Sequence, residues 1–379
     1  MVVVTRAPAN NFVALARHIY NPIGFAKGYN FVLFVIFGGA LIGFTLARFM
    51  YLDINGIFCN PDSKVGGAGP GECYYYLQGV ENVGIIIHLA GILPAAFLAV
   101  FQFVPAIRHK VLIVHRISGY LIILLSFTGV AGVFMIARHG LGGGLEIQSA
   151  AGFASIVFVS CKVIAFYNIK MLQIEQHRAW MLRAWCIASF IITMRLIGVI
   201  MAAIVGRSPK DYYYIQPCYI IDNMFRSNQT RVLSSYPACS AFYSGTDPEM
   251  HVPVPVGFAA DGVDRIGAAL NTSFGASAWL AFAIHFIGVE LYLRLTPAEA
   301  ERLRRVSYQR QVEAGMKNPG NAGLTAQRLG DAEPWSPPEL ATGKISGATG
   351  SSDSTNEARH AMTERVQARV SDPERDARR

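Results

Sequence analysis

Six long apolar blocks constrain this sequence more than any other feature. Each has about 20 predominantly hydrophobic residues, the length an α-helix needs to cross the roughly 30 Å hydrocarbon core of a bilayer. Backbone groups find no water in lipid, so each block should be a helix. The expected spans are residues 31–51, 83–104, 117–137, 152–169, 184–205 and 274–293. We therefore expect an all-α polytopic membrane helix bundle of about six transmembrane helices.

The composition of the 379-residue chain agrees with a position in lipid. Hydrophobic residues make up 52% and charged residues 15% of the chain, whereas soluble proteins carry roughly a quarter charged residues. The net charge is +8, and the Lys and Arg residues lie beside the apolar blocks and in the tail, and not in an aromatic-rich basic patch. We expect the bilayer, and no nucleic acid, as a partner. We find no nucleotide-binding glycine motif, HExxH or GxSxG in a suitable context. This disfavours enzymes that use nucleotides or catalyse hydrolysis.

Basic residues place the loops relative to the membrane. Connections 105–116 and 170–183 are rich in Arg, Lys and His, so the positive-inside tendency puts both in the cytosol. The N-terminal segment 1–30 and the chain after residue 293 are also basic, which puts both termini on the cytosolic side. The remaining connections then face outward. The same topology suits the endoplasmic reticulum, the plasma membrane and the vacuole.

The outer loops carry four cysteines and two sequons. Disulfides persist on that side of a membrane, and we favour Cys59 with Cys73 and Cys218 with Cys239 among the three pairings that four cysteines permit. Asn228 and Asn271 each begin an Asn-x-Ser/Thr sequence and are candidate glycosylation sites. The long outer loop 206–272 is expected to pack as a cap over the outer face. A disulfide-stapled spacer is the alternative.

The chain from residue 294 to 379 is rich in Gly, Ser, Pro and mixed charge. It has too little apolar surface to bury, so we expect a disordered basic cytosolic tail. A short helix is expected within it near residues 297–312, where its arginines could rest on anionic lipid headgroups.

Two histidines on the cytosolic side suggest a cofactor. His115 begins the third span and His177 precedes the fifth, so they lie at similar depth. Facing neutral imidazoles are common ligands of a haem iron, and Arg178 and Arg183 could pair with its propionates. Our leading hypothesis is a membrane redox protein with haem b at this site and an electron carrier as partner. The alternative is that these residues snorkel to the interface.

Arg195 and His88 support a second hypothesis. Arg195 lies near the middle of the fifth span, where a cation implies a cavity or a partner. It could hold the anionic group of a small hydrophobic ligand, such as a lipid, quinone or terpenoid, while His88 serves as acid or base. Both could instead be structural, with Arg195 bonded to carbonyls near Pro94. His139 and His285 are candidate partners of His88 in a weaker outer metal or haem site. A transporter or partner-binding membrane protein is the third hypothesis.

The run from His177 to Arg183, together with segments such as 115–120 and 191–197, resembles an uncharacterised domain-of-unknown-function (2306) family of multi-pass membrane proteins, in a fungal form. The resemblance covers the second to fifth spans, and its most specific feature is the run from His177 to Arg183. It implies a membrane fold and no established activity. The segments that carry it are 85–88, 102–105, 108–110, 115–120, 168–170, 176–183 and 191–197. The motif positions that it marks are His88, His115, His177, Arg178, Trp180, Arg183 and Arg195.

Overall fold

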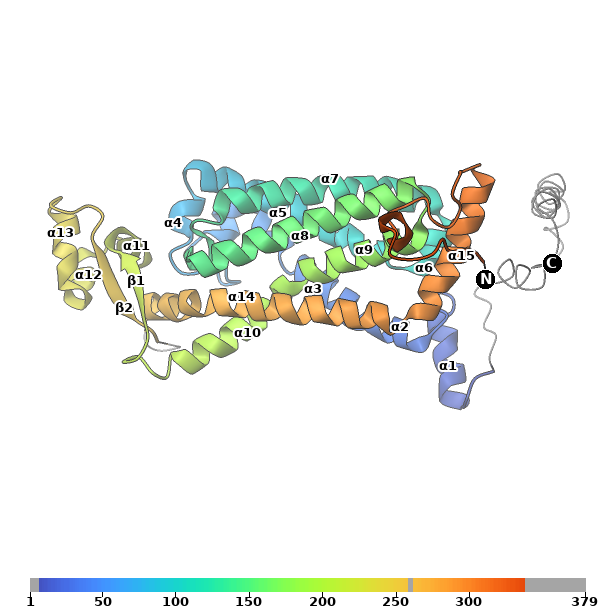
Figure 1. The fold of residues 1–379 in the computed structure, drawn as a ribbon. Coiled ribbons are helices and arrows are strands. Elements are labelled where there is room, and N and C mark those ends of the chain that lie inside the picture. Colours follow the sequence, from blue (N-terminus) through green and yellow to red (C-terminus); the bar gives the residue numbers. More distant parts are fainter. Residues whose placement is uncertain (1–6, 258–261, 338–379) are drawn as a thin grey trace, which may run out of the picture.

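Six long apolar helices form the body of the protein (Figure 1). The computed structural model describes residues 7–257 and 262–337. Each expected span overlaps one of its long helices, so the predicted all-α membrane bundle is confirmed. These helices are Gly28–Leu52, Gly79–Gln102, Leu112–Ile136, Leu145–Lys170, Ile174–Val205 and Val263–Arg294.

Two of the six spans are interrupted. The first consists of α2 (Gly28–Leu33), a π-helical turn and α3 (Gly39–Leu46). The fifth consists of α9 (Ile174–Ala188) and α10 (Phe190–Val205), which meet at Ser189. The Ser189 hydroxyl donates to the Trp185 carbonyl at 2.8 Å, a back-bond that often bends a helix. The uninterrupted spans are α5 (Gly79–Gln102), α7 (Leu112–Ile136), α8 (Leu145–Lys170) and α14 (Val263–Arg294).

Helices pack in pairs: α5 along α7, α8 along α9, and α10 along α14. Glycines explain the closest pair. A Cβ on Gly91 would lie 2.6 Å from the Gly129 nitrogen, and a Cβ on Gly132 would lie 2.5 Å from the Gly84 carbonyl oxygen. Small residues let membrane helices approach closely where lipid supplies no hydrophobic drive. The α5–α7 pair is therefore a rigid wall of the bundle.

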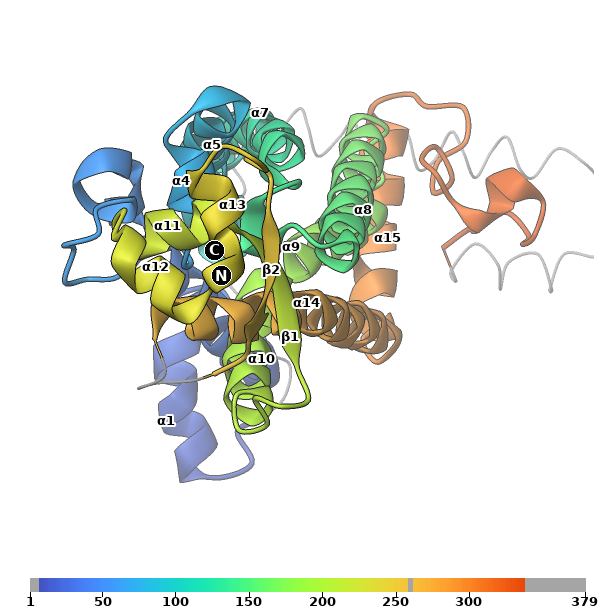
Figure 2. The same cartoon turned by 90° about the vertical axis from the view of Figure 1, so that its left-hand side faces the viewer.

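The outer end carries a folded cap, which faces the viewer in Figure 2. Strands β1 (Tyr213–Pro217) and β2 (His251–Pro255) pair antiparallel. Residues of the cap, which include Ile221, Val252 and Val254, share a hydrophobic core with Ala202 of α10 and Ala268 of α14. The long outer loop is thus a packed cap. The short helices at this end are α4 (Cys73–Tyr76), α11 (Cys218–Met224), α12 (Gln229–Ser235) and α13 (Ser240–Tyr243).

Both favoured disulfides are confirmed, as Cys59–Cys73 and Cys218–Cys239. All four cysteines lie in the outer connections, at the end opposite to the basic loops. The disulfides and the basic loops thus lie at opposite ends of the bundle, and which end faces the cytosol stays a prediction.

The cytosolic end holds more ordered structure than expected. It contains α1 (Asn11–Tyr20), α6 (Pro105–Lys110) and α15 (Pro297–Glu313). The helix expected near residues 297–312 is confirmed as α15. Residues up to 337 also fold onto the bundle, so the expectation of disorder from residue 294 onward is wrong for this part. Residues 1–6 and 338–379 lie outside the described residues, and the disorder expected for the end of the tail stays a prediction.

Buried hydrogen bonds hold this part of the tail. Gln173 is fully buried; its amide donates to Glu175 and to the Gly320 carbonyl, and its oxygen accepts from Gln311 and from the Gly323 nitrogen. Polar residues that satisfy one another can replace an apolar core at such a contact. Composition alone could not reveal that pairing.

Candidate functional site

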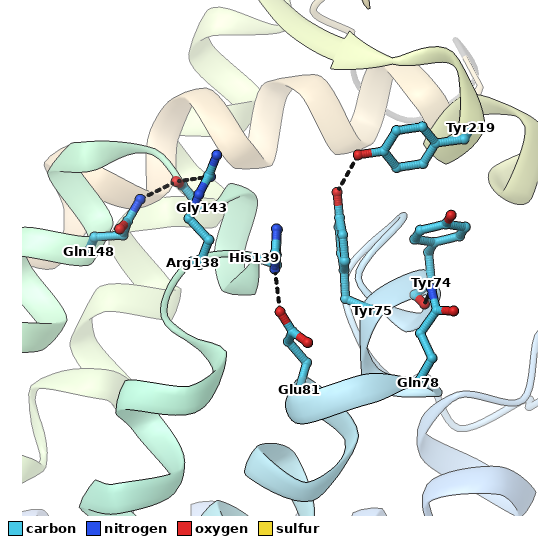
Figure 3. Close-up of polar contacts among 9 residues, drawn as sticks. All are labelled: Tyr74, Tyr75, Gln78, Glu81, Arg138, His139, Gly143, Gln148 and Tyr219. Carbon is cyan, nitrogen blue, oxygen red and sulfur yellow. Dashed lines mark hydrogen bonds and ion pairs between the residues drawn. The ribbon is translucent and has the colours of Figure 1, made fainter. Parts of the chain in front are cut away.

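A histidine–glutamate pair lies at the outer end of the bundle, beneath the cap (Figure 3). His139 Nδ1 is 2.7 Å from Glu81 Oε1, and their side chains are 26% and 21% exposed. The His139 ring stacks on Tyr75 with centroids 3.9 Å apart, and the Tyr75 hydroxyl lies 3.2 Å from that of Tyr219. A carboxylate that orients an imidazole is a common acid–base arrangement. The cluster is half-buried and could exchange protons with a ligand.

Four elements bring this cluster together. Glu81 is in the first turn of α5, His139 follows α7, Tyr75 belongs to α4 and Tyr219 to α11 of the cap. Burial raises the pKa of Tyr75, with the hydrogen bond to Tyr219 acting in the same direction, so the phenol stays neutral. The sequence analysis missed Glu81 and Tyr75. Glu81 could have been found as a carboxylate at the edge of an apolar block.

The outer loops are fixed around the cluster by a buried carboxylate. Glu72 accepts hydrogen bonds from the Gly69 and Leu141 nitrogens, each at 2.6 Å, and so joins the first and third connections. The Tyr214 hydroxyl of the cap donates to the Gly142 carbonyl. Residues 142–144, which resemble a flexible glycine turn in sequence, are therefore held in place.

Two arginines lie in the membrane below the cap. Arg195 of α10 is exposed, and its charge interacts with that of Arg48 at the end of the first span. Burial and the charge of Glu72 raise the pKa of Tyr76, whereas the charge of Arg195 lowers it. Because Tyr76 belongs to α4, the Arg195 guanidinium lies near that helix. Within residues 7–257 and 262–337, no carboxylate lies within ion-pair distance of either arginine, and no carbonyl near Pro94 accepts from Arg195. Arg48 was also missed, although it is the only charged residue in the expected first span.

The outer histidines are not brought together. His88 Nδ1 lies 2.9 Å from the Gly129 carbonyl oxygen, in the glycine-lined contact with α7. His285 bonds to the Cys186 carbonyl at 2.6 Å and to the Thr193 hydroxyl at 2.8 Å, which ties α14 to the α9–α10 joint. His139 pairs with Glu81. Each ring thus has a partner of its own, and this geometry suits structural roles for His88 and His285.

The inner histidines lie near enough for their charges to interact. His177 Nδ1 is 2.9 Å from the Ala165 carbonyl oxygen, whereas His115 Nδ1 is buried and has no hydrogen-bond partner among the described residues. The two arginines expected beside them have other partners. Arg183 makes a two-pronged ion pair with Glu290 at 2.5 and 3.0 Å, and Arg178 donates to the Tyr292 hydroxyl at 2.9 Å.

Other polar candidates also find defined places. Lys162 lies within α8, and its Nζ is buried between the rings of Phe158 and Trp185, 4.6 and 4.3 Å from their centroids. In the part of the chain that the structure describes, no three His, Cys, Asp or Glu side chains are grouped to hold a metal ion. Asn271 is buried inside α14, which leaves no room for a glycan, whereas Asn228 is exposed at the start of α12.

Comparison with curated proteins and with solved structures finds no significant match. One family model does match, over residues 85–222, and its family is described as a predicted membrane protein. That stretch contains His88, His139, His177 and Arg195, whereas Arg48 and Glu81 precede it. Residues 85–222 are thus similar to the predicted membrane protein family DUF2306.

Proposed function

We propose that this membrane protein binds an anionic amphiphile, with the acidic headgroup held by Arg195 and Arg48 in the outer half of the bilayer. The observation that carries the proposal is the presence of two neighbouring membrane-embedded guanidinium groups with no carboxylate beside them among the described residues. A charge in the middle of a bilayer costs about 2.5–3.5 kcal/mol on insertion scales. Such a pair needs a counter-charge.

The position of the pair favours a ligand that is partly in lipid. Arg195 lies ten residues before the end of α10 at Val205, which is about 15 Å of helix. Arg48 stacks on Phe44 at 4.2 Å from the ring centroid, so one face of its guanidinium is covered by an apolar ring. A phosphate or carboxylate at this depth would carry its hydrocarbon tail into the bilayer beside α10.

The histidine–glutamate pair above this site supports a chemical role at the same end. Tyr76, near Arg195, follows Tyr75, which stacks on His139. A ligand held by the arginines would have its polar end close to α4 and therefore close to this pair. His139, rather than the packed His88, is the histidine that we propose as acid or base.

Lipid binding tests the proposal directly. The protein would be purified in detergent and titrated with short-chain phosphatidic acid, oleate and phosphatidylcholine, with native mass spectrometry as the readout. We expect the two acidic amphiphiles to bind and the zwitterionic one not to. A hydrogen bond to a charged group contributes about 1.5–3 kcal/mol, so Arg195→Gln or Arg48→Gln should weaken binding by about tenfold to a hundredfold.

The matched control is Arg207→Gln. This substitution removes the same charge, and Arg207 is exposed just beyond the outer end of α10. It should bind acidic amphiphiles like the unmodified protein. Unchanged binding by the Arg195 and Arg48 variants, or an equal loss in all three, would refute the proposal.

Haem binding is a second candidate, favoured by the two inner histidines. The bond from His177 Nδ1 to Ala165 leaves Nε2 for a metal, as in many metal-bound histidines. The unpartnered nitrogen of His115 lies nearby. The engagement of Arg178 and Arg183 with Tyr292 and Glu290 weakens the case, because propionates would lack those partners.

An absorption spectrum decides this candidate. Oxidised and dithionite-reduced spectra of haem-supplemented protein would be compared with those of a His115→Ala, His177→Ala double variant. A sharp band in the reduced protein that disappears in the variant would establish the site. A featureless spectrum from folded protein would eliminate it and leave amphiphile binding as the proposal.

A further inference from the structure

A half-buried arginine at the cytosolic end has a buried nitrogen without a partner. Arg108 belongs to α6, which follows the second span. Its Nε is buried without a hydrogen-bond partner, and within the described ranges no carboxylate forms an ion pair with it. Burial lowers the pKa of Arg108, and Arg178 and Arg302 act in the same direction. An unpaired guanidinium in such surroundings is costly, and a bound anion would offset that cost.

Two further arginines surround Arg108. Arg178 comes from α9 and makes one side-chain bond, to Tyr292. Arg302 comes from α15, where it holds Glu299 through two hydrogen bonds of 2.9 and 2.8 Å. Among the described residues, Glu299 is the one carboxylate whose charge acts on Arg108. Three guanidinium groups thus face a single, already engaged carboxylate, which leaves a net local charge of two.

We propose that Arg108, Arg178 and Arg302 bind a phosphate monoester at the cytosolic end of the bundle. Guanidinium groups match phosphate because their planar forks bond two oxygens at once. A phosphate monoester carries nearly two negative charges at neutral pH, which equals the excess positive charge of the cluster. A carboxylate would neutralise half of it. This site uses other residues and the opposite membrane face from Arg195 and Arg48, so it does not rest on the proposed function.

The geometry joins three separate segments around the ligand. Helices α6 and α15 lie together at the cytosolic end of the molecule (Figure 1). A bound phosphate would therefore link the second span to the tail helix through Arg108 and Arg302. The phosphate could come from the headgroup of a cytosolic-leaflet lipid or from a soluble phosphorylated compound.

Thermal unfolding of the full-length protein in detergent tests the site. The probes would be inorganic phosphate, short-chain phosphatidylinositol 4-phosphate and phosphatidylcholine, at constant ionic strength. We expect at least one phosphate monoester or phosphate ion to raise the unfolding temperature, and phosphatidylcholine to leave it unchanged. A higher unfolding temperature with both inorganic phosphate and phosphatidylinositol 4-phosphate would show that the phosphate group is sufficient for binding. A higher unfolding temperature with phosphatidylinositol 4-phosphate alone would identify a site for a lipid headgroup.

Two variants and a control assign the residues. Arg108→Gln should weaken the binding of the active probe at least tenfold, and Arg302→Gln, whose side chain is 55% exposed, should do the same without disturbing the fold. Arg310→Gln removes an equal charge from the outside of α15 and should bind normally. The proposal is overturned if no phosphate probe stabilises the unmodified protein, or if Arg302→Gln and Arg310→Gln behave alike.

Discussion

Replacement of Gln173 by leucine should release the ordered part of the tail. The Gln173 side chain is fully buried and makes four hydrogen bonds, to Glu175, Gly320, Gln311 and Gly323, at 2.5, 3.0, 2.9 and 3.1 Å. An amide side chain can make four such bonds, so none of its capacity is unused. Leucine has a similar volume and can make none of them.

The expected cost follows from these bonds. Each contributes about 1 kcal/mol with a range of about 0.5–1.5 kcal/mol, so their combined loss is about 4 kcal/mol. The tail can avoid this cost by detaching, because water then satisfies the Gly320 carbonyl and the Gly323 nitrogen. The unfolding temperature of the whole bundle should therefore fall little, while the local stability of the docked tail falls by about 4 kcal/mol.

Amide hydrogen exchange measures this local stability. The amides of Gly320, Gly323 and Leu324 donate to buried side-chain oxygens. In Gln173→Leu their exchange should accelerate on the order of a thousandfold, since 1.4 kcal/mol corresponds to a factor of ten.

Gln176→Leu is the control, because Gln176 lies in the first turn of α9, just after Gln173, and its side chain has no hydrogen bond to any described residue. Slow exchange of the three amides in Gln173→Leu, or equally fast exchange in Gln176→Leu, would show that the hydrogen bonds of Gln173 do not hold the tail.

Four further outcomes are expected. Lys162→Met should raise the unfolding temperature, because the buried Nζ has no hydrogen-bond partner among the described residues and its contacts with the rings of Phe158 and Trp185 do not fully offset the cost of burying a cation. Cys218→Ser should destabilise the cap by about 3 kcal/mol in urea unfolding, since its disulfide spans 21 residues. Burial, and hydrogen bonds to aspartates, raise the pKa of Tyr236 and Tyr243 above the usual 10.0. Their contribution to stability is present below pH 10 and lost above it, so thermal melts should show a fall in cap stability from about that pH upward. Glycosidase treatment should change the gel mobility of the unmodified protein but not of Asn228→Gln.

Hydropathy predicted the six spans because it measures the property that the bilayer requires. The positive-inside tendency then placed the cysteines of the outer loops on one side, and the two pairings favoured among the three possible ones are those that the structure contains. The close α5–α7 contact was not predicted, since Gly84, Gly91, Gly129 and Gly132 gain meaning only when two helices are placed in register.

The candidate sites were less predictable because they depend on contacts between distant segments. Glu81 and His139 are 58 residues apart, and neither stands in a recognisable motif with the other. The tail was expected to be disordered because its composition is polar. Gln173 and Gln311 lie 138 residues apart, and the energy of their bond depends on burial that composition does not report.

The partners of the arginines also depend on contacts between distant segments. The structure separates these arginines into two groups. Arg183 is neutralised by Glu290, so its role is explained within the fold. Arg195, Arg48 and Arg108 have no carboxylate partner among the described residues, although each lies in a span or in a buried position next to one. Folding gains little from a cation that lies in or next to a membrane span without a carboxylate partner, and such a cation is therefore a stronger indication of a ligand than the presence of an arginine in a motif. The run from His177 to Arg183 contains the neutralised Arg183, whereas Arg48, Arg108 and Arg195 all lie outside it.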